Sequence, residues 1–114
     1  MKIKKLRSPE EVLLRDGRTL KQALELHNKW ILGEDGERLI LKGEDLSYTN
    51  LSNTDLINSD LSYTNLKYSD LSYTNLKYSD LKYTNLRYAN LRHADLMYAD
   101  LRHDKFYLTN LSKN

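Results

Sequence analysis

Residues 61–80 read LSYTNLKYSD LSYTNLKYSD, the same ten residues twice in succession. Each ten divides into two fives, and each five carries one Leu at the same place. The pattern extends in both directions from this stretch. The central residues of the fives are Leu46, Leu51, Leu56, Leu61, Leu66, Leu71, Leu76, Leu81, Leu86, Leu91, Leu96, Leu101, Phe106 and Leu111. The internal repeat is therefore the first feature that the fold must explain.

The positions around each centre are almost as regular as the leucines. The residue directly before the centre is Asp or Asn, with Lys105 as the one exception. The residue two before it is Thr, Ser or Ala, except for Glu44 and Asp104. The residue two after it is usually Tyr, at Tyr48, Tyr63, Tyr68, Tyr73, Tyr78, Tyr83, Tyr88 and Tyr98.

A period of five suits neither regular element. In an α-helix successive leucines would step by about 140° around the axis, and in a strand they would alternate between faces. A solenoid that turns a corner every five residues instead points each Leu, and the small residue two before it, at a common axis. Asp or Asn before the centre suits such a corner because its side chain hydrogen-bonds nearby backbone. Buried Thr and Ser hydroxyls would then need partners, which we expect to be backbone carbonyls.

The segments TNLSN, SDLSY, ANLRH and ADLMY resemble the A(D/N)LxX unit of pentapeptide-repeat proteins, and the resemblance covers residues 39–113. It implies a β solenoid, namely a right-handed quadrilateral β-helix with four pentapeptides, about 20 residues, in each coil. The repeats would then make about 3.5 coils and a rod about 17 Å long at the usual strand spacing. We assign residues 39–114 to this repeat domain.

Residues 1–38 read differently and are predicted to form a small N-terminal α/β cap of a hairpin and a helix. The stretch VLLRDGRTL at residues 12–20 has apolar residues on both sides of an Asp-Gly, which favours a hairpin. Thr19 and Gln22 form a capping-box pattern, and apolar residues follow at helical spacing as far as Ile31.

The two ends of a solenoid need covering, because the terminal layer of leucines is otherwise exposed to water. We expect the cap helix to cover the first coil, with Trp30 in its core and His27 at its edge. At the other end only residues 112–114 follow the repeats. Either this polar tail folds over the end or two chains stack there, since pentapeptide-repeat proteins often dimerise through their C-terminal ends. Monomer and end-to-end homodimer both remain open.

Composition limits the class of protein. The chain has 114 residues, no Cys and a net charge of +2, which excludes a disulfide scaffold and predicts no strong bulk attraction to nucleic acid. The basic start is not followed by an apolar stretch long enough for a signal peptide or a membrane span. We therefore expect a cytoplasmic protein with no membrane partner.

No pattern in the sequence points to catalysis, a metal or a cofactor. Phosphate-loop, dinucleotide and zinc-protease motifs are absent from the sequence. His93 and His103 are half a coil apart, and a column of Asp60, Asp80 and Asp100 is interpreted as corner structure screened by neighbouring cations. We predict a protein that is not an enzyme and has no cofactor.

The outward side chains are the candidate interaction surface. The predicted 20-residue coil stacks Tyr48, Tyr68 and Tyr88 in one ladder continued by Leu108, and runs Tyr63 and Tyr83 into His103. It also stacks Tyr78 on Tyr98 and Tyr73 on His93. Basic residues that follow the centres complete the surface, at Lys67, Lys77, Lys82, Arg87, Arg92 and Arg102. The ladders have two interpretations, since stacked rings stabilise adjacent coils and exposed Tyr is also common in protein interfaces.

These features favour a non-enzymatic module that binds, and inhibits or modulates, a protein partner. The partner is a host protein if the gene belongs to a phage or mobile element, an origin that the cap segment's resemblance to small bacterial and phage members suggests. One alternative implied by the resemblance is a DNA mimic acting on DNA gyrase or topoisomerase, although the repeats are close to neutral. A second alternative is nucleic-acid binding through the Tyr and Lys/Arg rows, against which the interleaved carboxylates argue.

Overall fold

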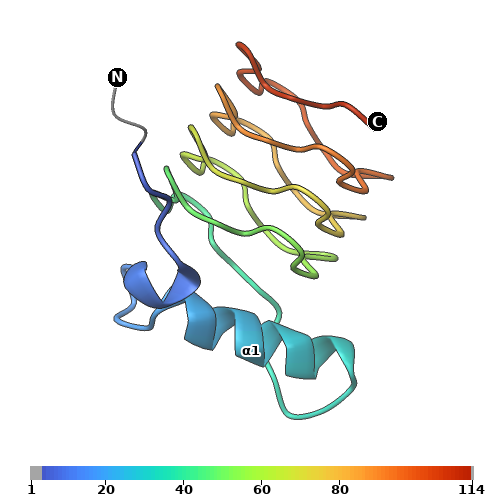
Figure 1. The fold of residues 1–114 in the computed structure, drawn as a ribbon. Helices are drawn as coiled ribbons and strands as arrows, with labels where there is room; N and C mark the ends of the chain where they lie inside the picture. The colour runs from blue at the N-terminus through green and yellow to red at the C-terminus, as the bar shows by residue number, and fades with distance from the viewer. Residues whose placement is uncertain (1–3, 114) are drawn as a thin grey trace.

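The computed structural model describes residues 4–113 and shows a helix laid across one end of a stack of coils (Figure 1). Its two helical elements are the 3₁₀ helix η1, Pro9–Glu11, and the α-helix α1, Leu20–Ile31. The first three residues of the predicted cap and the last residue of the predicted repeat domain lie outside the described residues.

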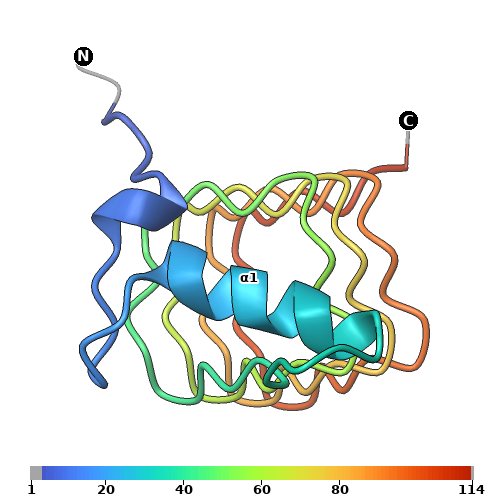
Figure 2. The ribbon, with the colours of Figure 1, turned by 90° about the horizontal axis from the view of Figure 1, so that it is seen from below.

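Neighbouring coils are joined by parallel bridges between residues 20 apart, from Ile40 with Asp60 to Asn90 with Asn110. One coil therefore holds four of the five-residue units, and equivalent positions of successive coils stack. Each bridge is a single residue pair, so residues 4–113 contain no extended strand or sheet. Because the chain turns a corner every five residues, each side of a coil is too short for more than one bridged pair. The coils are therefore drawn as loops without strand arrows (Figure 2).

Each corner is made by two residues with different tasks. The Asp or Asn before the centre accepts a hydrogen bond from the N–H two residues later, as Asp45 does from Ser47 at 3.0 Å. The left-handed turn itself falls two residues after the centre, where φ is 53° at Tyr48 and 61° at Tyr98. The sequence pattern indicates only the Asp or Asn as a corner residue. The structure separates its hydrogen bond from the left-handed conformation, which in most units a Tyr adopts.

The centres form one core with the small residues that precede them. Every centre from Leu46 to Leu86 is completely buried, and Leu91 nearly so. The buried hydroxyls of Thr64, Ser69, Thr74 and Ser79 donate to backbone carbonyls as expected, with Thr64 Oγ1 2.7 Å from the carbonyl oxygen of Leu61, whereas the buried Ser59 hydroxyl has no partner. Val12, Leu14 and Leu20 of the N-terminal segment belong to the same apolar cluster. The cap and the repeats thus share a continuous core.

The cap forms by the signals that the sequence carries. Leu13 and Thr19 are paired in an antiparallel bridge around the Asp-Gly turn. At the start of α1 the Gln22 N–H donates to Thr19 Oγ1 at 3.2 Å, and the Thr19 N–H donates to Gln22 Oε1 at 2.9 Å. The helix lies across the first coil (Figures 1 and 2) and buries Leu20, Ala23 and His27 against it.

The burial of two cap side chains, His27 and Trp30, is the reverse of what the sequence predicts. His27 is completely buried, whereas Trp30 is 37 % exposed and stacks on it with 5.5 Å between ring centroids. The reason is the backbone that enters the first coil. The Leu39 N–H donates to His27 Nδ1 at 3.0 Å, and an indole, which is only a donor, cannot accept this bond.

The C-terminal end of the stack is open. Leu96 and Leu101 are only half-buried, and Leu111 is 47 % exposed. The tail does not cross this end, because the His93 N–H donates to the Ser112 carbonyl at 3.0 Å and holds the tail along the wall of the coil. A hollow of about 440 Å³ remains between the tail and the half-buried leucines.

Candidate interaction surface

The 20-residue register sorts the outward side chains onto four faces, which we name after the first Leu of each column. The Leu46 face comprises the fives centred on Leu46, Leu66, Leu86 and Phe106. The Leu51, Leu56 and Leu61 faces follow in chain order. The residues predicted to form the interaction surface are therefore spread over all four sides of the coil. No single face brings them all together.

The Leu46 face carries the longest aromatic stack. The rings of Tyr48 and Tyr68 are 4.9 Å apart, and those of Tyr68 and Tyr88 are 4.5 Å apart and almost parallel, at 1°. Leu108 occupies the next place in this column, with the same left-handed conformation at φ of 52°, and is 65 % exposed. The ring that meets Tyr88 is Tyr107, edge-on at 5.5 Å. Tyr107 directly follows the centre Phe106, the position that Lys67 and Arg87 occupy in the preceding coils. The sequence distinguishes it only as the one tyrosine that does not stand two residues after a centre.

The other three faces carry shorter stacks. Their centroid distances are 4.9 Å for Tyr63–Tyr83, 4.6 Å for Tyr83–His103, 4.8 Å for Tyr73–His93 and 5.1 Å for Tyr78–Tyr98. These pairs are the ones that the 20-residue coil predicts. His93 and His103 stand in different stacks, so they share no site.

The basic side chains differ in whether an acid neutralises them. Three are paired with a carboxylate of their own face, as Lys77–Asp95 at 3.6 Å, Lys82–Asp80 at 3.1 Å and Arg102–Asp100 at 2.8 Å. Arg92 is exposed on the Leu51 face. Lys67 and Arg87, both on the Leu46 face, form no ion pair within residues 4–113.

The carboxylates of the Leu61 face are occupied by their own corners. Asp60 accepts from the N–H and the hydroxyl of Ser62, at 2.9 and 2.6 Å. Hydrogen bonds from the Arg102 side chain hold the pKa of Asp100 at about 2, far below its usual value. Within residues 4–113 no three His, Cys, Asp or Glu side chains are grouped to hold a metal ion.

Asp104 differs from every other Asp of the repeats because it occupies an inward position. Its Oδ1 accepts from the Thr84 N–H at 2.7 Å, while its Oδ2 is buried without a partner. Burial raises the pKa of this carboxyl to about 7. The sequence signals the position, since Thr, Ser or Ala stands there in the preceding coils, but not the protonation that follows from it.

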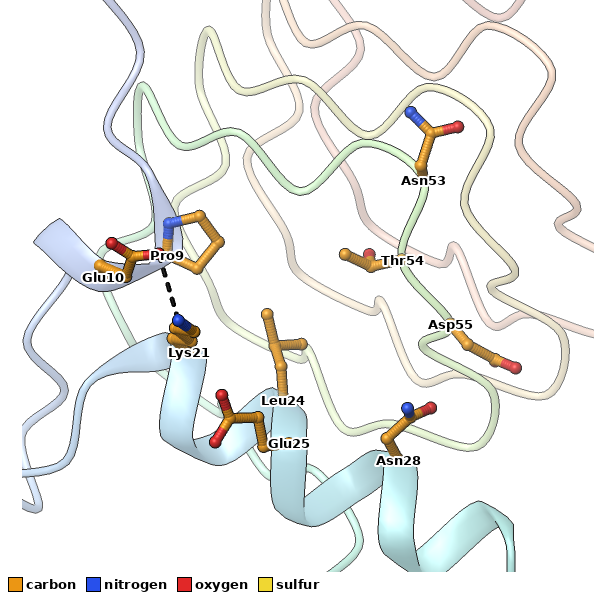
Figure 3. Close-up of a pocket in the computed structure, with 9 residues that line it drawn as sticks. All are labelled: Pro9, Glu10, Lys21, Leu24, Glu25, Asn28, Asn53, Thr54 and Asp55. Carbon is orange, nitrogen blue, oxygen red and sulfur yellow. Dashed lines mark ion pairs between the residues drawn. The ribbon is translucent and has the colours of Figure 1, made fainter.

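A groove that the sequence did not reveal lies between α1, η1 and the first coil (Figure 3). Its volume is about 480 Å³, and Lys21, whose Nζ is 3.4 Å from Glu10 Oε1, is the one cation that lines it. The lining residues are Pro9, Glu10, Lys21, Leu24, Glu25, Asn28, Asn53, Thr54 and Asp55. They come from three separate segments, and no motif links them.

The family model described as "Pentapeptide repeats (8 copies)" matches residues 41–77 and 74–112, well over half of the chain. The chain belongs to the pentapeptide-repeat family. The matched residues include every stacked aromatic pair except the one in the cap. No helix within residues 4–113 of this pentapeptide-repeat protein is long and apolar enough to cross a membrane.

Solved pentapeptide-repeat structures are similar to this chain over part of their length. Rfr23 from the cyanobacterium Cyanothece 51142 is 28% identical, over 62% of this chain and 56% of that chain, with a TM-score of 0.36. A protein from the Arabidopsis thaliana thylakoid lumen is 23% identical, over 66% and 63%, with a TM-score of 0.30. One from Nostoc PCC 7120 is 27% identical, over 83% and 79%, with a TM-score of 0.27.

This chain thus spans less than two thirds of the first two of these proteins. No curated protein sequence matches it.

Proposed function

We propose that this pentapeptide-repeat protein is a non-enzymatic interaction module whose tyrosine rows bind and modulate a protein partner. The observation that carries the proposal is the set of aromatic stacks on all four faces, with neighbouring rings 4.5 to 5.1 Å apart. Corner geometry fixes the backbone of each Tyr, and its neighbours fix the ring. Such side chains lose little conformational entropy when a partner docks, which favours tight binding.

The architecture that presents these rows is, in our proposal, the right-handed quadrilateral β-helix of the family. The 20-residue register and the left-handed corner in each five-residue unit from Leu46 to Phe106 support this assignment. The main-chain hydrogen bonds between coils, such as Leu66 N–H to the Asn85 carbonyl at 2.9 Å, give a stiff support for the side chains. Surface complementarity, with no reaction, is then the mechanism.

The gyrase-directed DNA mimic is not supported by the arrangement of charge. Such a mimic needs an uninterrupted acidic surface that resembles the phosphates of a duplex. The one column of three carboxylates in the repeats, on the Leu61 face, is interleaved with Lys82 and Arg102, which bond to Asp80 and Asp100. We therefore propose a partner that recognises rows of tyrosine with mixed charge.

The test is affinity capture from nuclease-treated bacterial lysate with matched pairs of tyrosine variants. Tyr68→Asn/Tyr88→Asn removes the stack of the Leu46 face, and Tyr78→Asn/Tyr98→Asn removes that of the Leu56 face. Asn suits this position, because Asn53 and Asn58 already occupy it with φ of 59°. Folding of each variant is checked by circular dichroism and thermal unfolding.

We expect a stoichiometric protein that is captured by the wild type and lost with one of the two folded variants. A partner that both variants retain at wild-type level contradicts the role of these tyrosines. If folded bait captures no protein at all, the proposed function is wrong for this proteome, and a structural or self-assembling role takes its place.

A further inference from the structure

Basic side chains gather on the Leu46 face, and carboxylates are nearly absent from its surface. After the first coil, the residue before the centre on this face is Asn65, Asn85 and then Lys105. Each of the other three faces has an Asp at this position in at least one later coil. Asp45 of the first coil is the one exposed carboxylate among these fives. Lys4 and Arg7 are the basic residues that act on Asp45. The later coils of this face add Lys67, Arg87 and Lys105.

The two remaining carboxyls of the same fives are occupied or buried. Glu44 accepts from the Arg15 N–H at 3.2 Å and lies 3.5 Å from its guanidinium Nε. Asp104 points inward and bonds to the Thr84 backbone. Lys67, Arg87 and Lys105 consequently form no ion pair within the described part of the chain, unlike the cations of the Leu56 and Leu61 faces. Their charge is available to a partner.

In the stack of Tyr48, Tyr68 and Tyr88 the ring edges point outward, and neighbouring groups cover the ring faces. Tyr68 is sandwiched between Tyr48 and Tyr88. The Lys4 Nζ lies 4.0 Å from the ring centroid of Tyr48, and the edge of Tyr107 covers Tyr88. A nucleic-acid base needs a free aromatic face on which to stack, and Tyr48, Tyr68 and Tyr88 each have a neighbour on both faces, which leaves only Tyr107, 62 % exposed at the end of the column. What remains outward are phenol hydroxyls and ring edges, flanked by ammonium and guanidinium groups.

We propose that the Leu46 face binds an acidic segment of a protein partner, in which several Asp or Glu side chains lie close together. Lys67 and Arg87 stand one coil apart, about 4.8 Å at the usual spacing of neighbouring coils. The Cβ atoms of residues three or four apart on a helix are separated by about 5–6 Å, so neighbouring acids of one helical segment reach neighbouring coils. The tyrosine edges and hydroxyls pack against the rest of the segment. The inference rests on the proposed function and specifies its partner and its face.

The experiment measures binding of fluorescein-labelled decaglutamate by fluorescence anisotropy at low and moderate salt. The test variant, Lys67→Ser/Arg87→Ser/Lys105→Asn, carries residues that the chain itself uses at these positions in other coils. The matched control, Lys77→Ser/Lys82→Ser/Arg102→Ser, removes the same number of positive charges from the Leu56 and Leu61 faces. Circular dichroism and thermal unfolding confirm that both variants are folded. A ten-nucleotide oligothymidylate is the competing polyanion.

We expect the test variant to bind decaglutamate about tenfold more weakly than the wild type, and the control variant to change affinity by about twofold or less. Each exposed ion pair contributes little by itself, so a large loss requires that all three removed cations contact the same ligand. Equal losses in both variants would mean that only net charge matters, and would overturn the assignment to this face. Absence of decaglutamate binding, or tighter binding of oligothymidylate, overturns the acidic protein segment as the ligand. A lysate partner that the test variant retains but a tyrosine variant of another face loses would overturn this inference alone, and the proposed function would stand.

Discussion

The carboxyl group of Asp104 bonds to the backbone of Thr84, one coil below it and in the same inward column. The Thr84 N–H is 2.7 Å from Oδ1, while Oδ2 is buried with no partner. Burial, with smaller contributions from the charges of Asp100 and Asp80, raises the pKa of Asp104 to about 7. Below about pH 7 the folded chain therefore favours the neutral acid.

Stability should reflect this titration. Between about pH 4 and pH 7 the unfolded chain has released the proton that the folded chain still holds, so the free energy of unfolding falls as pH rises through this range. Asp104→Thr, the residue of the two preceding coils, should raise stability at pH 8 by about 1–2 kcal/mol after discounting for solvent screening. Urea unfolding at pH 5 and pH 8 measures the difference. Parallel pH profiles for variant and wild type would contradict the raised pKa.

His27 should impose the opposite dependence on pH. It is completely buried, and burial lowers its pKa below the usual value because the charged imidazolium loses its hydration. The unprotonated Nδ1 accepts from the Leu39 N–H. Asp55 and Arg38 are the charged groups that act on it. Its contribution is complete above about pH 6.5 and is lost as the pH falls below that value.

The variant His27→Asn keeps an acceptor and removes the titration. Its stability relative to the wild type should therefore rise as the pH is lowered from 7 to 5. The comparison must be a difference between variants, because the Asp104 and His27 effects run in opposite directions in the wild type. Thermal unfolding at several pH values supplies it. A constant difference across the range would contradict the buried neutral histidine.

Much of the repeat could be predicted because one rule places every residue in it. The spacing of the leucines gave the coil, and the 20-residue register that the family implies gave the stacking of Tyr63 on Tyr83 and of Tyr73 on His93. The failures occur where a residue lacks a neighbouring coil or has a special partner. The register does not predict Tyr107, whose ring meets Tyr88 at 5.5 Å from the position directly after a centre.

The cap was predictable in outline and not in depth. Apolar spacing identified the face of α1 but could not rank Trp30 against His27, because the decisive partner is a backbone N–H that approaches from Leu39. The asymmetry of the Leu46 face is visible in the sequence only after residues are aligned by column. Asn65, Asn85 and Lys105 then stand at the position where the Leu61 face has Asp60, Asp80 and Asp100.

The left-handed corner should distinguish a stacked residue from an unstacked one. Leu108 has φ of 52° and is 65 % exposed, so burial of its side chain offsets little of the strain of this conformation. Leu108→Asn should stabilise the chain by about 0.5–1 kcal/mol, because Asn tolerates this conformation better. Tyr68→Asn relieves the same strain but removes two ring contacts, and should destabilise by about 0.5–2 kcal/mol. Urea unfolding of both variants checks the signs, and stabilisation by Tyr68→Asn would show that the stack contributes little.

Truncation of the leucines should measure how far the open end differs from the middle of the stack. Leu71 is completely buried, whereas Leu111 is 47 % exposed at the C-terminal end. Leu71→Ala should lower the free energy of unfolding by about 2–5 kcal/mol, and Leu111→Ala by about 1 kcal/mol or less.

Equal losses for the two variants would mean that a partner covers the end in solution. A second copy stacked there would also make the effect of Leu111→Ala depend on protein concentration, because dimer formation stabilises the folded chain by mass action. Unfolding at two protein concentrations a hundredfold apart separates the cases. A small, concentration-independent loss is the result expected for the open end.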